Sequence, residues 1–146
     1  MRPILLVEDN RDDETLVRRA LRWSGVDCEV VVARDGAAAL DYLFGLGEWN
    51  ERDLGEQPLL VLLDISLPTV NGFEVLRQIR ADPITRRVPV VVLTASSRQS
   101  DILSGYDAGA NGYVVKPTQL PEFVDAARWL GHYWARLNEA APITSA

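Results

Sequence analysis

The sequence contains a single cysteine, a single histidine and a single lysine. One cysteine excludes an internal disulfide, and Cys28 with His132 is too small a set for a cysteine and histidine metal site. We expect Cys28 to lie in the core and His132 to take part in packing of the last helix. The other 14 basic residues are arginines, so Lys116 is the one ammonium side chain.

Long hydrophobic runs are missing. The longest apolar segments, 59–63 and 88–93, are far shorter than the roughly 18 residues that a membrane-spanning helix requires. The apolar residues near the N-terminus are followed at once by Glu8 and Asp9, so they do not resemble a signal peptide. These absences predict a cytoplasmic protein that does not span a membrane.

Basic residues are outnumbered by acidic ones. The 21 acidic and 15 basic residues give a net charge of −6, which argues against a nucleic-acid-binding protein. Internal repeats and low-complexity segments are also absent from the sequence. With 146 residues, 47% of them hydrophobic and 25% charged, the chain fits one compact globular domain.

Short apolar runs alternate with segments of helical spacing. The runs predict strands at 4–7, 28–33, 59–63, 88–93 and 112–115. Helices are expected between Asn10 and Gly25, at 37–46, 73–80 and 101–108, and from about 120 onward. Continuously apolar strands are typical of a parallel sheet that helices cover on both faces. We therefore predict a doubly wound α/β domain over 1–138, with an inserted loop at 45–58 and a short tail at 139–146.

Polar side chains follow four of the apolar runs. They are Glu8 and Asp9 after the first run, Asp64 after the third, Thr94 after the fourth and Lys116 after the fifth. The carboxyl ends of parallel strands meet at one edge of the sheet, where ligands bind. Three carboxylates gathered there would repel one another unless a cation joined them. Because oxygen ligands favour a hard ion, we expect Mg²⁺.

Four segments, in this order, resemble the receiver domains of two-component response regulators, of which the chemotaxis receiver is the minimal example. They are VEDN at 7–10, LLDISLP at 62–68, VVLTA at 91–95 and GYVVKP at 112–117. The resemblance covers almost the whole chain and implies a flavodoxin-like (βα)5 fold with five parallel strands in the order 2-1-3-4-5. The loop 45–58, the segment 76–83 and the tryptophan-bearing last helix further resemble stand-alone receivers associated with bacterial phytochromes.

The resemblance assigns a role to each strand-end residue. Asp64 would take a phosphoryl group from a phosphohistidine of a sensor histidine kinase. Asp9, and Glu8 directly or through water, would hold Mg²⁺ together with Asp64 and the backbone carbonyl of Ser66. Lys116 would pair with the phosphoryl oxygens as a point charge. The chain would then be a signalling domain, with self-phosphorylation and autodephosphorylation as its only reactions, and not an enzyme.

The same resemblance implies a conformational switch. Thr94 would move to hydrogen-bond the phosphoryl group, and the backbone N–H of Ala95 would supply another donor. Tyr113 would follow into the space that Thr94 leaves. The Lys116–Pro117 peptide bond is expected to be cis. One departure is Glu8, which stands where many relatives carry aspartate.

Two alternative functions stay open at this point. A degenerate receiver that acts only as a binding module would lack Asp9, Asp64, Thr94 or Lys116, and all four are present. A small phosphatase with an aspartate nucleophile would need a second aspartate two residues after Asp64, where Ser66 stands. Because the last strand and helix extend to about residue 138, we expect no effector domain and an output through another protein.

Two apolar lines run along the last helix. The first, which suffices to dock the helix on the sheet, has an a/d spacing and consists of Phe123, Ala127, Leu130, Trp134 and Leu137. The second line consists of Ala126, Trp129 and Tyr133. We expect Trp129, Tyr133 and Trp134 to bury against another copy and to form a homodimer.

Overall fold

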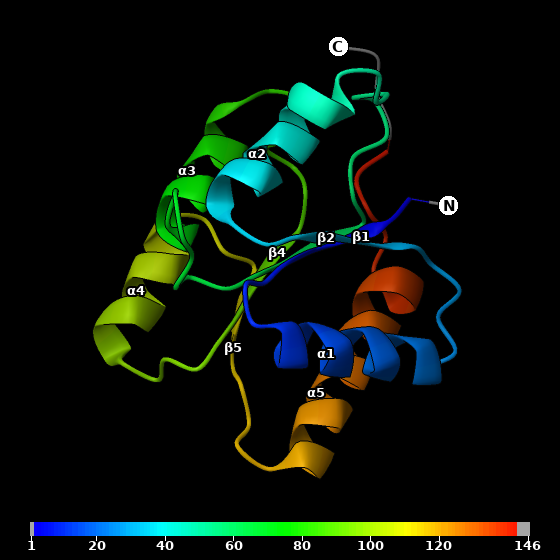
Figure 1. Ribbon diagram of the computed structural model, residues 1–146, viewed down its shortest axis with the longest axis vertical. Coiled ribbons are helices and arrows are strands. Elements are labelled where there is room, and N and C mark those ends of the chain that lie inside the picture. The colour runs from blue at the N-terminus through cyan, green and yellow to red at the C-terminus, as the bar shows by residue number, and fades with distance from the viewer. Residues whose placement is uncertain (1, 143–146) are drawn as a thin grey trace.

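Strands and α-helices alternate five times in the computed structural model, which describes residues 2–142. The strands are β1 (Ile4–Val7), β2 (Val30–Ala33), β3 (Leu60–Leu63), β4 (Val90–Thr94) and β5 (Gly112–Val115). The α-helices are α1 (Arg11–Trp23), α2 (Gly36–Phe44), α3 (Gly72–Ala81), α4 (Gln99–Asp107) and α5 (Leu120–His132). The strands form one parallel sheet in the order β2-β1-β3-β4-β5 (Figure 1), which confirms the predicted fold class and strand order.

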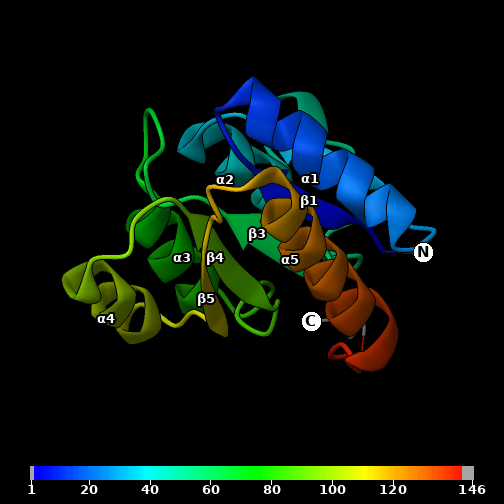
Figure 2. The ribbon, with the colours of Figure 1, turned by 90° about the horizontal axis from the view of Figure 1, so that it is seen from below.

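Both faces of the three central strands β1, β3 and β4 are buried. In β1, Leu5 and Val7 pack on one face and Ile4 and Leu6 on the other, and all four are buried. Helices α2 and α3 cover the first face, whereas α1 and α5 lie side by side on the second (Figure 2). This two-sided cover explains why the strands are apolar at successive positions instead of alternating.

Side-chain caps start three of the helices. The Asn10 side-chain oxygen accepts the Asp13 N–H at 3.0 Å, and that of Asn71 accepts the Glu74 N–H at 3.1 Å. Asp35 caps α2 in the same way. Since α1 begins just after β1, the first of these caps also fixes the chain beyond that strand.

Helices α1 and α5 approach one another closely at Gly131. A Cβ atom at this position would lie 2.5 Å from Cδ2 of Leu21, which is nearer than two carbon atoms can pack. Glycine costs a helix roughly 1 kcal/mol relative to alanine. The close approach of the two helices accounts for its presence here.

The loop between α2 and β3 is packed against α2. Its one regular element is the short 3-10 helix η1 (Gly47–Trp49). The Arg52 guanidinium donates to the carbonyls of Tyr42 and Leu43 and lies 4.1 Å from the centre of the Tyr42 ring. The Trp49 ring meets the same tyrosine edge-on, with the ring centres 4.9 Å apart. These contacts hold the loop to the face of α2.

One expectation from the sequence holds only in part and another is wrong. Cys28, which lies before β2, packs against the core but is half-buried. The described chain contains no cis peptide bond, so Lys116–Pro117 is trans, the form that X–Pro bonds favour by about 0.5–1 kcal/mol.

A π-helical turn and a short segment without regular secondary structure follow α5. A five-residue π-helical turn, η2 (Tyr133–Leu137), follows α5 directly. Of the predicted tail, residues 139–142 are described and residues 143–146 lie outside the described residues. The Arg2 guanidinium donates to the carbonyl of Ala141 at 2.9 Å, which ties this segment to the start of the chain. No described helix combines the length and hydrophobicity needed to cross a membrane.

Candidate functional site

The carboxyl ends of four strands converge at one edge of the sheet (Figure 1). Glu8 and Asp9 follow β1, Asp64 follows β3, Thr94 ends β4 and Lys116 follows β5. The N–H of Lys116 donates to the Thr94 carbonyl at 2.7 Å, which continues the sheet ladder one residue past the strand. The sheet hydrogen bonding therefore extends to the backbone of Lys116.

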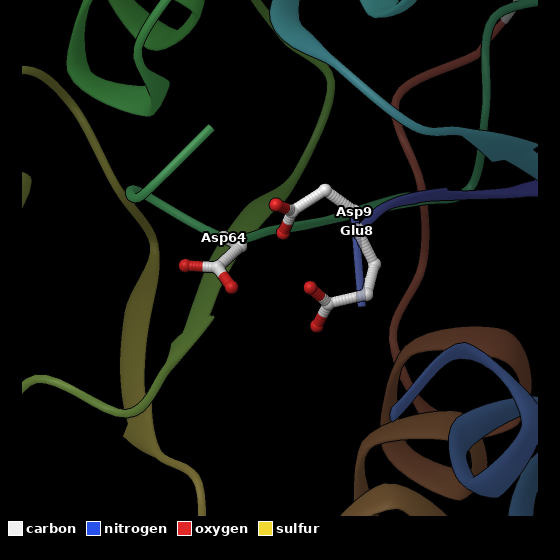
Figure 3. Close-up of side chains that lie close together, drawn as sticks. All are labelled: Glu8, Asp9 and Asp64. Atoms are coloured by element: carbon white, nitrogen blue, oxygen red, sulfur yellow. The ribbon is translucent and has the colours of Figure 1, made fainter. Parts of the chain in front are cut away.

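Three carboxylates lie together at this edge. Figure 3 shows Glu8 and Asp9 at the end of β1 beside Asp64 at the end of β3, with one oxygen of each within 4.8 Å of the others. Glu8 is 1% exposed and Asp64 is 7% exposed, whereas Asp9 faces solvent. The cluster therefore has two buried members and one that a dissolved ion can reach.

The Lys116 ammonium group lies among carboxylates. Its Nζ donates to Glu8 at 2.5 Å, to Asp13 at 2.8 Å and to Asp64 at 3.0 Å, and the lysine side chain is 9% exposed. Asp13 is not among the site residues that the sequence predicts. Asp13 follows the Asn10 cap by three residues, so it stands in the first turn of α1, which begins just after Glu8 and Asp9. This position is the signal that could have identified it.

Each oxygen of the Asp64 carboxylate has its own partners. Oδ1 accepts hydrogen bonds from the Thr94 hydroxyl at 2.9 Å and from the Ser66 N–H at 3.0 Å. Oδ2 accepts from Lys116. Thr94 is buried, so its hydroxyl depends on this contact. The Asp64 side chain is thereby fixed in one orientation.

The loop after Asp64 is tied to the start of α2. The Gly36 N–H donates to the Pro68 carbonyl at 3.2 Å, and the Ala37 N–H donates to the Thr69 hydroxyl at 3.0 Å. Thr69 has a φ of 65°, a left-handed conformation that is uncommon for a β-branched residue. The loop, and with it Ser66, therefore takes its position from α2.

The charges at the site leave an excess of negative charge. Burial raises the pKa of Glu8 to about 7, against the hydrogen bond and charge of Lys116. Burial alone would lower the pKa of Lys116, but the hydrogen bonds to Asp13 and Glu8 outweigh it and the pKa is raised. Three carboxylates, those of Glu8, Asp13 and Asp64, pair with the one ammonium group, and the Asp9 carboxylate lies beside Glu8 and Asp64 without a lysine partner. Oxygen donors with excess negative charge fit a divalent cation.

Tyr113 belongs to β5, and its side chain reaches the loop after β4. Its hydroxyl donates to the carbonyl of Ser96 at 3.0 Å, and the Ser96 hydroxyl donates to Asp101 at 2.5 Å. A Cβ atom on Gly105 would lie 3.2 Å from the Tyr113 ring, so the ring packs against α4. The hydrogen bond of Tyr113 to Ser96 was not predicted. Ala95, which precedes Ser96, is exposed at the end of β4.

The aromatic residues at the end of α5 differ in exposure. Trp129 is 73% exposed and Tyr133 is 48% exposed, whereas Trp134 is partly buried against the core. Leu137 belongs to the predicted docking line but is exposed, because the wider π-helical turn moves it away from the sheet. The predicted contact with another copy therefore rests mainly on Trp129 and Tyr133.

Comparison with known sequences identifies the family of this chain. Residues 4–128 match the response regulator receiver domain. The chain belongs to this family. The receiver is 37% identical over 131 residues to the response regulator Rcp1 of Synechocystis sp., a match that covers 90% of this chain and 87% of Rcp1.

Solved structures agree with this assignment. The Mn²⁺-bound form of Rcp1 has a TM-score of 0.89 and 35% identity, covering 97% of this chain and 99% of that one. The phosphorylated cyanobacterial phytochrome response regulator RcpA has a TM-score of 0.89 and 38% identity, covering 95% and 97%. The bacteriophytochrome response regulator RtBRR has a TM-score of 0.77 and 48% identity, covering 97% and 85%.

Family membership establishes the class of function. This receiver is a response regulator of phosphorylation-dependent two-component signalling, and it is a signalling protein and not a classical enzyme. The phosphatase alternative is thereby set aside. The degenerate-receiver alternative finds no support in the geometry, because Asp9, Asp64, Thr94 and Lys116 lie together at one edge.

Proposed function

We propose that Asp64 accepts a phosphoryl group from a phosphohistidine of a sensor histidine kinase. The observation that carries this proposal is that the Asp64 carboxylate contacts both the Thr94 hydroxyl and the Lys116 ammonium group. A carboxylate oxygen would attack phosphorus, so that an O–P bond forms while the histidine N–P bond breaks. The electron pair of the broken bond leaves with the imidazole nitrogen, and the product is an aspartyl phosphate.

The carboxylates of Glu8, Asp9 and Asp64 would hold Mg²⁺ together with the backbone carbonyl of Ser66. The oxygen-only donor set, its spacing within 4.8 Å and the Mn²⁺-bound form of Rcp1 support this assignment. A bound divalent cation supplies positive charge to the oxygens of the transferring phosphoryl group. Because Glu8 already accepts a hydrogen bond from Lys116, it would contact the cation directly or through a water molecule.

Thr94 and Lys116 would change partners when Asp64 is phosphorylated. The Thr94 hydroxyl would turn from Asp64 to a phosphoryl oxygen, and the Lys116 ammonium group would pair with another. The backbone N–H of Ala95, an exposed residue, would supply a further donor. Tyr113 would follow into the space that Thr94 leaves. Hydrolysis of the aspartyl phosphate by the domain itself would end the signal.

A phytochrome-type sensor kinase would be the phosphoryl donor. Two of the similar structures are a cyanobacterial phytochrome response regulator and a bacteriophytochrome response regulator, at 38% and 48% identity. Such a kinase would meet this receiver in the cytoplasm, which is the location expected from the sequence.

Two copies of the receiver would associate through the end of α5. Trp129 and Tyr133 supply exposed aromatic area there, and Trp134 lies behind them with its ring centre 4.9 Å from that of Tyr133. Aromatic residues of this kind are enriched in protein interfaces. The contact would be isologous, with the same surface on both copies.

Phosphorylation with acetyl phosphate tests the acceptor. In the presence of Mg²⁺, intact-mass spectrometry should show one added phosphoryl group on the wild-type receiver and none on Asp64→Asn, since an amide is a far weaker nucleophile. Asp12→Asn, which removes an exposed acid from the same end of α1, is the matched control and should be phosphorylated normally. Full phosphorylation of Asp64→Asn would refute the assignment. Transfer from autophosphorylated candidate kinases would then identify the donor.

A further inference from the structure

Asp13 belongs to the site by contact, although it stands outside the four receiver segments. It is the third residue of α1, and its Oδ2 lies 2.8 Å from the Lys116 Nζ. The two residues are 103 positions apart in the sequence, and the Asp13 side chain is only 25% exposed. This ion pair therefore joins the start of α1 to the end of β5.

The three carboxylate partners of Lys116 are not equivalent. Glu8 and Asp64 also belong to the cluster of three carboxylates, whereas Asp13 does not. A divalent cation in that cluster would draw on the negative charge of Glu8 and Asp64 and would repel the ammonium group beside them. Asp13 alone among the partners would keep its full charge for Lys116.

The position of Asp13 is itself fixed. Its backbone N–H is capped by the Asn10 side chain at 3.0 Å, and the Asn10 N–H donates to Glu8 Oε2 at 3.3 Å. The start of α1 is thus one connected segment from Glu8 to Asp13. The ammonium group is held between that segment and Asp64.

We propose that Asp13 is a positioning residue that keeps the Lys116 ammonium group at the site while a divalent cation occupies the neighbouring carboxylates. The inference rests on the proposed function, in which Lys116 must stay within reach of a phosphoryl group on Asp64. Without Asp13, the ammonium group has only the two partners that the cation also uses. Binding of the cation would then compete with the ion pairs that hold the Lys116 ammonium group. When Asp13 is present, the cation can bind and the ammonium group can stay in place at the same time.

Asp13→Asn tests the role of this carboxylate, with Asp12→Asn as the matched control. Both variants remove one negative charge from the first turn of α1. Asp12 makes no ion pair within residues 2–142, so it separates the contact with Lys116 from the general loss of charge. Isothermal titration with Mg²⁺ alone should show roughly tenfold weaker binding for Asp13→Asn, as loss of one charge-assisted hydrogen bond implies. Asp12→Asn should stay within about twofold of wild type.

The single lysine offers a spectroscopic measurement that reports on Lys116 directly. With ¹⁵N-labelled lysine, the side-chain ammonium signal comes from this residue alone. In wild type and Asp12→Asn, its protons should exchange slowly with water both before and after Mg²⁺ is added, because Lys116 stays buried and paired. In Asp13→Asn, addition of Mg²⁺ should release the ammonium group to solvent, and the signal should broaden or vanish.

The possible results separate this inference from the proposed function. If Asp13→Asn and Asp12→Asn bind Mg²⁺ equally and keep the same lysine signal, the role of Asp13 is wrong while the acceptor assignment stands. If the wild-type receiver itself binds no Mg²⁺, both are overturned. Thermal melting of the two variants in metal-free buffer checks that each is folded, and the amide of asparagine is well tolerated near a helix start.

Discussion

Alanine at Gly36 would push against the loop that carries Ser66. A Cβ atom there would lie 1.9 Å from the carbonyl oxygen of Val70 and 2.7 Å from its carbonyl carbon. These are backbone atoms, so no rotation of a side chain can relieve the overlap. The loop must move by more than about 1 Å to restore a carbon to oxygen contact of about 3.3 Å. That movement breaks the hydrogen bonds of the Gly36 and Ala37 N–H groups to Pro68 and Thr69.

The size of the effect follows from three contributions. Overpacking costs about 1–3 kcal/mol, and the two lost hydrogen bonds cost about 1 kcal/mol each. The higher helix propensity of alanine stabilises the helix by at most about 1 kcal/mol and offsets part of this loss. We expect the free energy of unfolding of Gly36→Ala to fall by about 3 kcal/mol, which lowers the Tm of a domain of this size by roughly 6–12 °C.

Two other glycines provide matched controls. A Cβ atom at Gly131 would meet the end of the flexible Leu21 side chain at 2.5 Å, and one at Gly112 would meet Val91 methyl groups at an ordinary 3.6 Å. The helix propensity of alanine offsets much of the first contact, so Gly131→Ala should cost about 0–2 kcal/mol. Gly112→Ala should be neutral within about 1 kcal/mol.

Urea denaturation followed by circular dichroism measures all three variants. The expected order of destabilisation is Gly36, then Gly131, then Gly112. Because the Gly36 contact positions the loop with Ser66, Gly36→Ala should also weaken Mg²⁺ binding, whereas Gly112→Ala should not. A Gly36→Ala variant as stable as Gly112→Ala would refute the reasoning, since it would show that the loop yields without cost.

Two further predictions concern the switch and the assembly. Thr94→Val removes the hydroxyl that donates to Asp64, so the free energy of unfolding should fall by about 1–2 kcal/mol. Phosphorylation by acetyl phosphate should still occur in this variant. A Tm higher than that of wild type would contradict the predicted loss of stability. Sedimentation equilibrium at micromolar concentration should show a wild-type dimer, and Trp129→Ala with Tyr133→Ala should be monomeric. A wild-type monomer, or a dimer that the double variant keeps, would exclude this interface.

The sequence determined the architecture because its signals are local. Apolar runs ended by polar residues mark buried parallel strands, and the carboxyl ends of such strands must share one edge whatever the helices between them do. This rule alone brings Glu8, Asp9, Asp64, Thr94 and Lys116 into one region. The structure places all five there.

The helix starts at Asn10 and Asn71 were predictable for a similar reason. A cap acts within three residues of its own position, so the sequence window contains both partners of the hydrogen bond. The end of the last helix was less predictable. The a/d spacing assumes a regular helix, and the π-helical turn at Tyr133–Leu137 breaks that spacing. Leu137 is therefore exposed and does not pack on the sheet with the other residues of the predicted docking line.

Only the tertiary structure decided which partners the polar side chains have. Asp13 is an ordinary acidic residue of a first helical turn until α1 packs against α5 and its first turn meets Lys116, 103 residues away. Gly131 looks unfavourable until α5 packs against Leu21. In both cases the deciding contact joins distant parts of the chain, and its distance depends on how two elements pack. Local sequence patterns determine the elements, whereas only the packed structure determines which of their side chains meet.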